Sequence, residues 1–405
     1  MSRSTLRRAL VLSGGGARGA YEVGVLAYLY EAMAESLERA PLEILCGTSV
    51  GANNPSFLAA HANAPKHGMA ELRRLWHEFD LSDTLRIGLR DLSRIPWDFG
   101  AVLQPGQEVS GVLINSRHLQ RKVVRSIRWG QIRRNLRSGV IRSVSVSTTE
   151  ISSGRTVVFV DRSEGGVPPW SRDKRVHAVG TRLGPVHALA SAAIPFIFPS
   201  IRIDGRYYTD GSLRQATPLS PAVRLGADRV LVVGVRQRGD DRVVPVENEG
   251  APDEPPGAFT LGGKLLNALL LDRLDYDLRR LEDMNTLLID GERTFGPKFI
   301  ENLHETTKRF RHQPYRIVDT LSVYPTGDMG TLATQFIDEV HPTVGGLPGW
   351  LLSRFGQMAA FNASDIMSYL LFDGRYAEQL IEMGYSDAHA MRDELEAFFR
   401  DDPLH

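Results

Sequence analysis

The chain has 405 residues, of which 42% are hydrophobic and 24% are charged, so it is long enough for a catalytic domain with an appendage. This composition is typical of globular proteins and excludes a largely disordered or fibrous chain. The 48 Lys and Arg residues balance 48 Asp and Glu residues, so the net charge gives no general attraction to nucleic acid.

The first part of the chain alternates between strand and helix signals. An apolar run at 9–12 is followed by glycines and by a stretch with helical periodicity at 17–37. A second strand is predicted at 42–46, and the segment after 47–51 is predicted to be helical. This order favours a parallel sheet covered by helices. Further strands are predicted at 140–147, 156–160, 229–235 and 315–324.

The second part of the chain is predicted to be mainly helical. Residues 247–263 are rich in Pro, Gly and acidic residues and predict a flexible connection. The helix predicted at 264–281 carries leucines on one face, which indicates contact with the core, and the alternative is a lipid-contacting lid. From residue 347 onward the apolar spacing predicts further helices. We therefore expect a catalytic domain at 1–335 and a helical C-terminal extension at 336–405.

Charge is unevenly distributed along the chain. Acidic residues dominate between Glu378 and Asp402. The segment between Glu108 and Glu150 has no acidic residue. Its basic residues are Arg117, Arg121, Lys122, Arg125, Arg128, Arg133, Arg134, Arg137 and Arg142. Two solvated helical faces, or an internal contact between them, is the first interpretation. The alternative is a basic face that contacts an anionic membrane surface. No nucleic-acid partner is expected, because the basic segment has only Trp129 for base stacking.

Several signals bear on the compartment. Cys46 is the only cysteine, which excludes an intramolecular disulfide and cannot by itself build a zinc site. The apolar run after the first arginines is too short for a signal peptide. The apolar stretch 186–201 falls below the roughly 18 residues that a membrane span needs. We expect a soluble, cytoplasmic protein, or one that contacts a membrane peripherally.

A glycine-rich segment lies between the first predicted strand and helix. Its members are Gly14, Gly15, Gly16, Ala17, Arg18 and Gly19. The spacing matches a dinucleotide-binding loop, but the acidic residue that such a site needs is missing from the end of the second strand. A Walker A loop also fails, because Ala20 stands where lysine is required. The remaining interpretations are a tight turn that needs glycine, and a loop whose N–H groups stabilise a developing negative charge.

The second motif is a Gly-x-Ser-x-Gly sequence between a strand and a helix. It consists of Gly47, Thr48, Ser49, Val50 and Gly51. In a nucleophile elbow, this pattern projects the serine oxygen above the sheet on a strained turn, and small flanking residues avoid clashes. The strand-turn-helix setting favours Ser49 as a nucleophile over a structural helix cap.

A nucleophilic serine needs a base, and Asp210 is the acidic candidate. On its own, an aspartate before Gly211 predicts no more than a turn. With the two earlier motifs, however, the set resembles the bacterial patatin-like phospholipases. The matching segments are 14–19, 47–51, 190–195 and 210–211.

This resemblance implies an α/β fold, namely a three-layer α/β/α arrangement with a mainly parallel central sheet. It implies that Ser49 is the nucleophile and that Asp210 is its direct base, without a histidine. It places the oxyanion hole in the backbone of Gly14, Gly15, Gly16, Arg18 and Gly19 and gives segment 190–195 a structural role. Ser212 stands where the family usually has Gly or Ala, and 368–374 resembles the helical tail of bacterial members.

The expected reaction needs no metal and no cofactor. Ser49 attacks a lipid ester carbonyl while Asp210 takes its proton, and water then hydrolyses the acyl-enzyme. A carboxylate with an ordinary pKa of about 3.9 is a poor base for serine, so burial should raise this pKa. Phospholipids or lysophospholipids are the expected substrates, and short-chain carboxylesters are expected artificial ones.

Two alternatives are weighed against this dyad. A Ser-His-Asp esterase would combine Ser49 and Asp210 with His304, His312 or His341, although none of these histidines has a recognisable catalytic neighbourhood. A lipid-binding protein of the same fold would lack turnover, and a serine-directed fluorophosphonate would leave it unlabelled.

Overall fold

The structure is a computed structural model that describes most of the predicted elements. It describes residues 6–80, 122, 125–168, 170, 175–195, 198–237, 274–307, 314–340 and 363–401. The connection expected at 247–263 and the start of the helix expected at 264–281 lie outside these residues.

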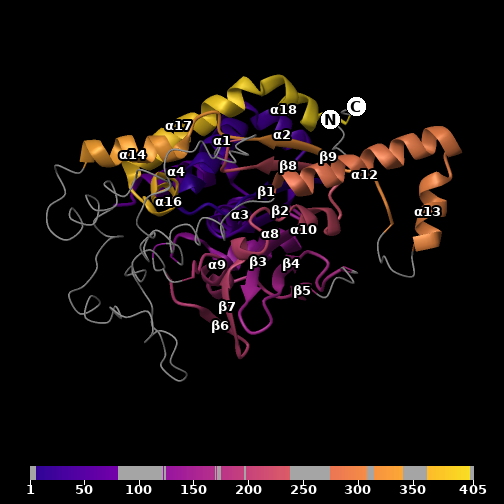
Figure 1. Ribbon diagram of the computed structural model, residues 1–405, viewed down its shortest axis with the longest axis horizontal. Helices are drawn as coiled ribbons and strands as arrows, with labels where there is room; N and C mark the ends of the chain where they lie inside the picture. The colour runs from indigo at the N-terminus through magenta and orange to yellow at the C-terminus, as the bar shows by residue number, and fades with distance from the viewer. Residues whose placement is uncertain are drawn as a thin grey trace, which may run out of the picture.

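The described strands form one sheet at the centre of the molecule (Figure 1). Their order is β5-β4-β3-β2-β1-β8-β9, and β7 pairs with both β3 and β6. Five neighbouring strands are parallel: β3 (Ser143–Glu150), β2 (Leu42–Thr48), β1 (Arg8–Leu12), β8 (Arg229–Val233) and β9 (Asp319–Val323). The remaining strands are β4 (Thr156–Arg162), β5 (Val176–Gly180), β6 (Ile201–Ile203) and β7 (Arg206–Asp210).

The sheet is covered on both faces, which explains the continuous apolar runs of its central strands. Along β1, Leu10 and Leu12 point into one hydrophobic cluster, and Ala9 and Val11 point into the other. The first cluster includes side chains of α1 (Gly19–Ala32), α3 (Val50–His61), α4 (Pro65–His77), α8 (Trp129–Arg137) and α17 (Gly374–Ala390). The second includes side chains of α10 (Leu219–Arg224) and α12 (Leu274–Phe295). The predicted three-layer α/β/α fold is therefore confirmed.

The predicted elements differ from the observed ones mainly at their ends. The strand predicted at 42–46 continues to Thr48, and the helix predicted at 17–37 is divided into η1 (Gly16–Arg18), α1 and α2 (Ala34–Arg39). Three strands were not predicted, namely β5, β6 and β7, because they are short and partly exposed and lack a continuous apolar run. Helix α12 buries Leu278 against the core, as the core-facing interpretation predicts for this residue.

The C-terminal region is helical, as predicted. It comprises α14 (Met329–Val340), α16 (Ala363–Leu370), α17 and α18 (Arg392–Phe399). Helix α17 lies directly against α1 (Figure 1), where a Cβ at Gly384 would stand 2.1 Å from the backbone oxygen of Tyr21. The Tyr21 hydroxyl donates to Asp387 at 3.0 Å across the same contact. The expected boundary at 335/336 falls inside α14, and the division into two domains remains a prediction.

The end of α18 is held by two buried arginines of the sheet. Arg8 and Arg229 are neighbours on β1 and β8 and are almost fully buried. Arg8 Nε donates to the backbone oxygen of Phe398 at 3.1 Å, and Arg229 Nη1 donates to the same oxygen at 3.0 Å. These charge-assisted bonds satisfy carbonyl groups that the end of a helix leaves free. The last described helix is therefore tied to the central strands.

The described charged residues form local ion pairs. Arg133 lies 3.0 Å from Asp161, and Arg142 lies 3.0 Å from Glu164. The described acidic residues near the C-terminus have other partners; Asp401, for example, lies 3.0 Å from Arg8. The ion pairs found for the described part of the basic stretch are with Glu43, Glu71, Glu78, Asp161 and Glu164. Contact with an anionic membrane remains a prediction. No described helix is both long enough and apolar enough to cross a bilayer.

Two glycine substitutions are predicted to change the stability in opposite directions, because one lies in the contact between α1 and α17 and the other does not. Gly384→Ala should lower the free energy of unfolding by about 1–3 kcal/mol, because its Cβ would overlap the backbone of α1. Gly130→Ala in α8 should raise it by about 0.5–1 kcal/mol, because no atom lies within 4 Å of the added carbon. Urea unfolding of both variants measures the difference, and equal effects would contradict the close packing.

Candidate active site

Ser49 stands on the sharp turn between β2 and α3. Its backbone has φ 57° and ψ −130°, a left-handed conformation that is unfavourable for any residue except glycine. The glycines on either side allow the turn to close: a Cβ at Gly47 would lie 1.7 Å from the oxygen of Gly51, and one at Gly51 would lie 2.3 Å from the oxygen of Ser13. This geometry is the strained strand-turn-helix arrangement that the Gly-x-Ser-x-Gly pattern predicts.

Asp210 reaches Ser49 because two strands share one edge of β3. Strand β2 pairs with β3 up to Thr48, which is opposite Ser147. Antiparallel β7 then pairs with the next residues, and Asp210 is opposite Thr148. The residue after Thr48 therefore meets the last residue of β7, although 161 positions separate them in the chain. Ser49 Oγ donates a hydrogen bond to Asp210 Oδ2 at 2.6 Å.

The small-residue segment 190–195 holds the backbone of both Ser49 and Asp210 in place. Ser191 Oγ accepts a hydrogen bond from the backbone N–H of Ser49 at 2.8 Å and donates to the oxygen of Ser147 at 2.6 Å. The backbone oxygen of Ala193 accepts from the N–H of Asp210 at 2.9 Å. The segment thus contacts the backbone of both residues, and its small side chains permit the close approach.

Burial changes the acidity of Asp210. The side chain is fully buried, and removal from water raises the pKa of Asp210 to about 6. Hydrogen bonds from the Ser49 hydroxyl and from the backbone N–H of Ser212, at 2.8 Å from Oδ1, oppose this rise because they stabilise the carboxylate. The carboxyl group is therefore a stronger base than an exposed aspartate, yet it is still ionised at neutral pH.

The glycine-rich segment lies beside Ser49, but its N–H groups are not equivalent. The N–H of Gly14 donates to the oxygen of Ala216 at 2.9 Å, and that of Arg18 donates to the oxygen of Gly15 at 3.1 Å. The N–H of Gly19 donates to the carbonyls at the start of η1. Within the described part of the chain, the N–H groups of Gly15 and Gly16 have no acceptor. Of the five residues at which the oxyanion hole is expected, Gly15 and Gly16 thus remain as candidate donors.

Gly14 has a steric role instead. A Cβ at this position would lie 2.2 Å from Ser212 Oγ and 3.1 Å from the Cβ of Ser49. The absence of a side chain at Gly14 therefore leaves room for the Ser212 hydroxyl.

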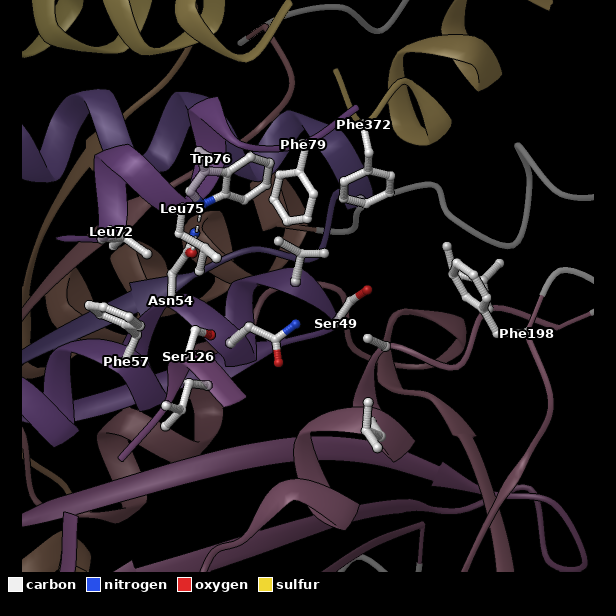
Figure 2. Close-up of a pocket in the computed structure, with 17 residues that line it drawn as sticks. Ser49, Asn54, Phe57, Leu72, Leu75, Trp76, Phe79, Ser126, Phe198 and Phe372 are labelled. Atoms are coloured by element: carbon white, nitrogen blue, oxygen red, sulfur yellow. Dashed lines mark hydrogen bonds between the residues drawn. The ribbon is translucent and has the colours of Figure 1, made fainter. Parts of the chain in front are cut away.

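Ser49 opens into an apolar pocket (Figure 2). The pocket has an empty volume of about 790 Å³, including the part open to solvent. In Figure 2, Trp76, Phe79 and Phe372 form one side of this space, and Phe198 lies on another. The other apolar lining residues are Val50, Phe57, Leu72, Leu75, Ile127, Leu189, Ala192 and Ile194.

A buried polar chain supports one wall of the pocket. Glu22 Oε2 accepts a hydrogen bond from Asn54 Nδ2 at 2.8 Å, and Asn54 Oδ1 accepts one from Trp76 Nε1 at 3.3 Å. Burial raises the pKa of Glu22 well above its ordinary value. This chain fixes the indole ring in the pocket wall and joins helices α1, α3 and α4.

The pocket wall was not predicted from the sequence. On α4 it contains Leu72, Leu75 and Trp76, whose spacing of three and four residues marks one helical face. A helix that packs against the core shows the same spacing, so the sequence does not distinguish a pocket wall from a core contact. Only the position of α4 beside Ser49 identifies it as a pocket wall. Phe372 belongs to the segment 368–374 that resembles the tail of bacterial members, but nothing in the sequence placed it at the pocket.

The histidines of the alternative triad are not brought to Ser49 by any described contact. His304 lies on α13 (Phe299–Thr307), which extends away from the body of the molecule with α12 (Figure 1). His312 and His341 lie outside the described residues. Among the described side chains, the hydrogen-bond acceptor found for the Ser49 hydroxyl is Asp210.

A protein-family model described as patatin-like phospholipase matches residues 10–223. The match covers more than half of the 405 residues and includes Ser49 and Asp210. The chain belongs to the patatin-like phospholipase family, and this membership supports lipid hydrolysis in general as its activity.

Solved structures with a related arrangement are distant. The crystal structure of VipD from Legionella pneumophila is 11% identical with a TM-score of 0.35, and the match covers 97% of this chain and 68% of that one. ExoU in its heterodimeric complex with SpcU, from the type III secretion system of Pseudomonas aeruginosa, is 15% identical with a TM-score of 0.28, covering 100% and 74%. The search of curated proteins finds no match.

The raised pKa of Asp210 predicts that Asp210→Asn gains stability relative to the wild type as the pH rises. The folded protein holds this proton more tightly than the unfolded chain, so the stability that the group contributes is present below about pH 4 and is lost as the pH passes through about 6. The difference in unfolding free energy should therefore change by about 2 kcal/mol between pH 4 and pH 7. Urea unfolding at several pH values measures it, and a difference independent of pH would contradict the burial effect.

Proposed function

We propose that the protein is a lipid acyl hydrolase that uses Ser49 and Asp210 as a catalytic dyad. The observation that carries this proposal is the 2.6 Å hydrogen bond from the Ser49 hydroxyl to a buried carboxylate, at the wall of an apolar pocket. Phospholipase A, lysophospholipase and carboxylesterase activities all use this chemistry. Membership of the patatin-like phospholipase family supports the same class of reaction.

In the first half of the reaction, Ser49 Oγ attacks the carbonyl carbon of the ester and its proton passes to Asp210 Oδ2. When the tetrahedral intermediate collapses, the ester bond breaks and Asp210 returns the proton to the leaving alcohol. In the second half, Asp210 takes a proton from water, the resulting hydroxide attacks the acyl-enzyme, and Ser49 recovers its proton. A pKa of about 6 suits this role, because the group is ionised at neutral pH and still accepts a proton readily.

The negative oxygen of each tetrahedral intermediate needs hydrogen-bond donors. The N–H groups of Gly15 and Gly16 are the candidates, because they have no acceptor in the described structure and Gly16 lines the pocket beside Ser49. Loss of one such donor typically lowers the rate by about 100-fold or more. The glycine-rich segment is thus proposed to stabilise charge rather than to bind a nucleotide phosphate.

The apolar lining indicates the substrate class. Phe57, Leu72, Leu75 and Trp76 give the pocket an interior suited to a hydrocarbon chain. Each methylene group buried there contributes about 0.8 kcal/mol of favourable transfer free energy. We therefore propose a long-chain acyl group in this pocket, with the ester carbonyl at Ser49 and the headgroup toward solvent. A cytoplasmic location and peripheral contact with an anionic membrane belong to the same proposal.

The dyad is tested by Ser49→Ala and Asp210→Asn. Both variants should lose at least about 100-fold of the turnover, because one lacks the nucleophile and the other lacks the base. The measurement is mass spectrometry of the products from a mixed lipid extract. A fluorophosphonate probe should label the wild type and leave Ser49→Ala unlabelled.

Ser56→Ala is the matched control, because Ser56 is also buried on α3 but its hydroxyl donates to the backbone oxygen of Ala52 in its own helix. It should keep the activity of the wild type. Near-normal turnover of a folded Asp210→Asn variant would show that Asp210 is not the base. A wild type that neither turns over lipid nor accepts the probe would indicate a non-catalytic lipid-binding protein.

The acyl pocket is tested by Leu75→Trp, which places a larger ring in the pocket. The ratio of kcat/KM for a long-chain ester to that for a short-chain ester should fall at least about tenfold, because the loss of two methylene contacts is enough for such a change. Arg74→Trp adds the same ring at an exposed position of the same helix and should leave this ratio unaltered. If both variants give the ratio of the wild type, the acyl chain binds elsewhere.

A further inference from the structure

The glycine-rich segment is in direct contact with the C-terminal extension. Gly16 has φ +54°, and a Cβ at this position would lie 2.1 Å from the backbone oxygen of Tyr369 near the end of α16. The two segments are therefore closer than any residue with a side chain at position 16 allows. This contact lies at one of the two N–H groups proposed to stabilise the negative oxygen.

The side chain of Arg18 makes a second contact between the glycine-rich segment and the extension, and it is only 3% exposed. Its Nε donates to Ser368 Oγ at 2.7 Å, and its guanidinium carbon lies 4.1 Å from the centre of the Tyr369 ring. Its Nη1 also donates to the backbone oxygen of Val235, beyond the end of β8, at 3.3 Å. A charge-assisted hydrogen bond and a cation–π contact in a water-free setting are both stronger than their exposed counterparts.

Arg18 transmits this anchoring to the N–H donors through the backbone. The N–H of Arg18 donates to the oxygen of Gly15 at 3.1 Å, so the arginine and the glycine belong to one hydrogen-bonded turn. Glycine has the largest backbone freedom of any residue, and a loop that contains three in succession does not hold its N–H groups in one direction by itself. Arg18 supplies the first polar side chain of the turn, and two of its partners belong to the extension.

The same part of the extension continues into the pocket wall. After α16, the ring of Phe372 lies 5.6 Å from that of Phe79 and 6.3 Å from that of Trp76, measured between ring centres (Figure 2). The N–H of Gly374 donates to the oxygen of Phe79 at 2.8 Å. Residues 368–374 therefore connect the glycine-rich turn on one side of the site with the pocket wall on the other.

We propose that residues 368–374 of the C-terminal extension complete the active site, and that Ser368 and Tyr369 are positioning residues that act through Arg18 on the N–H groups of Gly15 and Gly16. This inference rests on the proposed hydrolase function. These residues lie outside the segment 10–223 that the family model matches, so in this chain the matched segment alone does not hold the oxyanion donors in place. Such donors are effective only when they are fixed before the reaction begins.

The direct test is Ser368→Ala, which removes the acceptor of Arg18 Nε. We expect kcat for a short-chain ester to fall about tenfold while KM stays within twofold, because the donors act on the transition state and not on the bound ester. The rate of labelling by a fluorophosphonate should fall by a similar factor, since that reaction also places negative charge on an oxygen beside Ser49.

The matched control is Ser220→Ala. Ser220 Oγ accepts a hydrogen bond from Arg224 Nε at 3.0 Å within α10, so the control breaks a bond of the same kind on the opposite face of the sheet. Its kcat should equal that of the wild type. The melting temperatures of both variants separate a loss of positioning from a loss of folded protein.

Tyr369 gives a second comparison. Tyr369→Phe keeps the ring beneath the guanidinium and should lose much less of kcat than Tyr369→Leu, which removes it. The melting temperatures of both variants separate the loss of the ring from a loss of folded protein.

The outcomes separate the two proposals. If the wild type is active and Ser368→Ala has the kcat and labelling rate of Ser220→Ala, the positioning role is wrong and the hydrolase function stands. If kcat falls only in proportion to the amount of unfolded protein, the role of Ser368 is structural and the inference is also wrong. If the wild type has neither turnover nor labelling, the proposed function fails and the inference fails with it.

Discussion

The whole site depends on how strand β3 is paired along a single edge. Parallel β2 pairs with that edge as far as Ser147, and antiparallel β7 pairs with it from Thr148 onward. The last residue of each strand is thereby brought to the same point, which is why a serine and an aspartate 161 positions apart share a hydrogen bond. Backbone pairing, and not any affinity between the two side chains, fixes their meeting.

The site is held in a state that the rest of the molecule must stabilise. Ser49 has a left-handed backbone conformation, and Asp210 is a carboxyl group removed from water. Both features are unfavourable locally, and both favour the chemistry proposed for the site, since one exposes the hydroxyl and the other strengthens the base. The close-packed glycines and the contacts of segment 190–195 offset these two unfavourable free-energy terms through many small backbone interactions.

The C-terminal extension has more contact with the site than its position in the sequence indicates. Helix α17 lies against α1, the end of α18 is bound by Arg8 and Arg229, and the turn after α16 reaches the pocket. The chain therefore returns to its glycine-rich segment after 350 residues and to its first strand after 390. These contacts are the basis for the proposed positioning role of the extension.

The sequence by itself determined the local structures of this protein: the fully apolar parallel strands, the glycine-rich turn and the Gly-x-Ser-x-Gly turn, because each depends on neighbouring residues and their periodicity. It also singled out Ser49 and Asp210 as candidates, although Asp210 without the other motifs predicts only a turn. Tertiary structure alone decided which N–H groups in the glycine-rich segment have no acceptor, which helix face lines the pocket, and that Phe372 and Ser368 lie at the site. These properties depend on contacts between distant segments, and a pattern that buries a side chain does not specify which surface it is buried against.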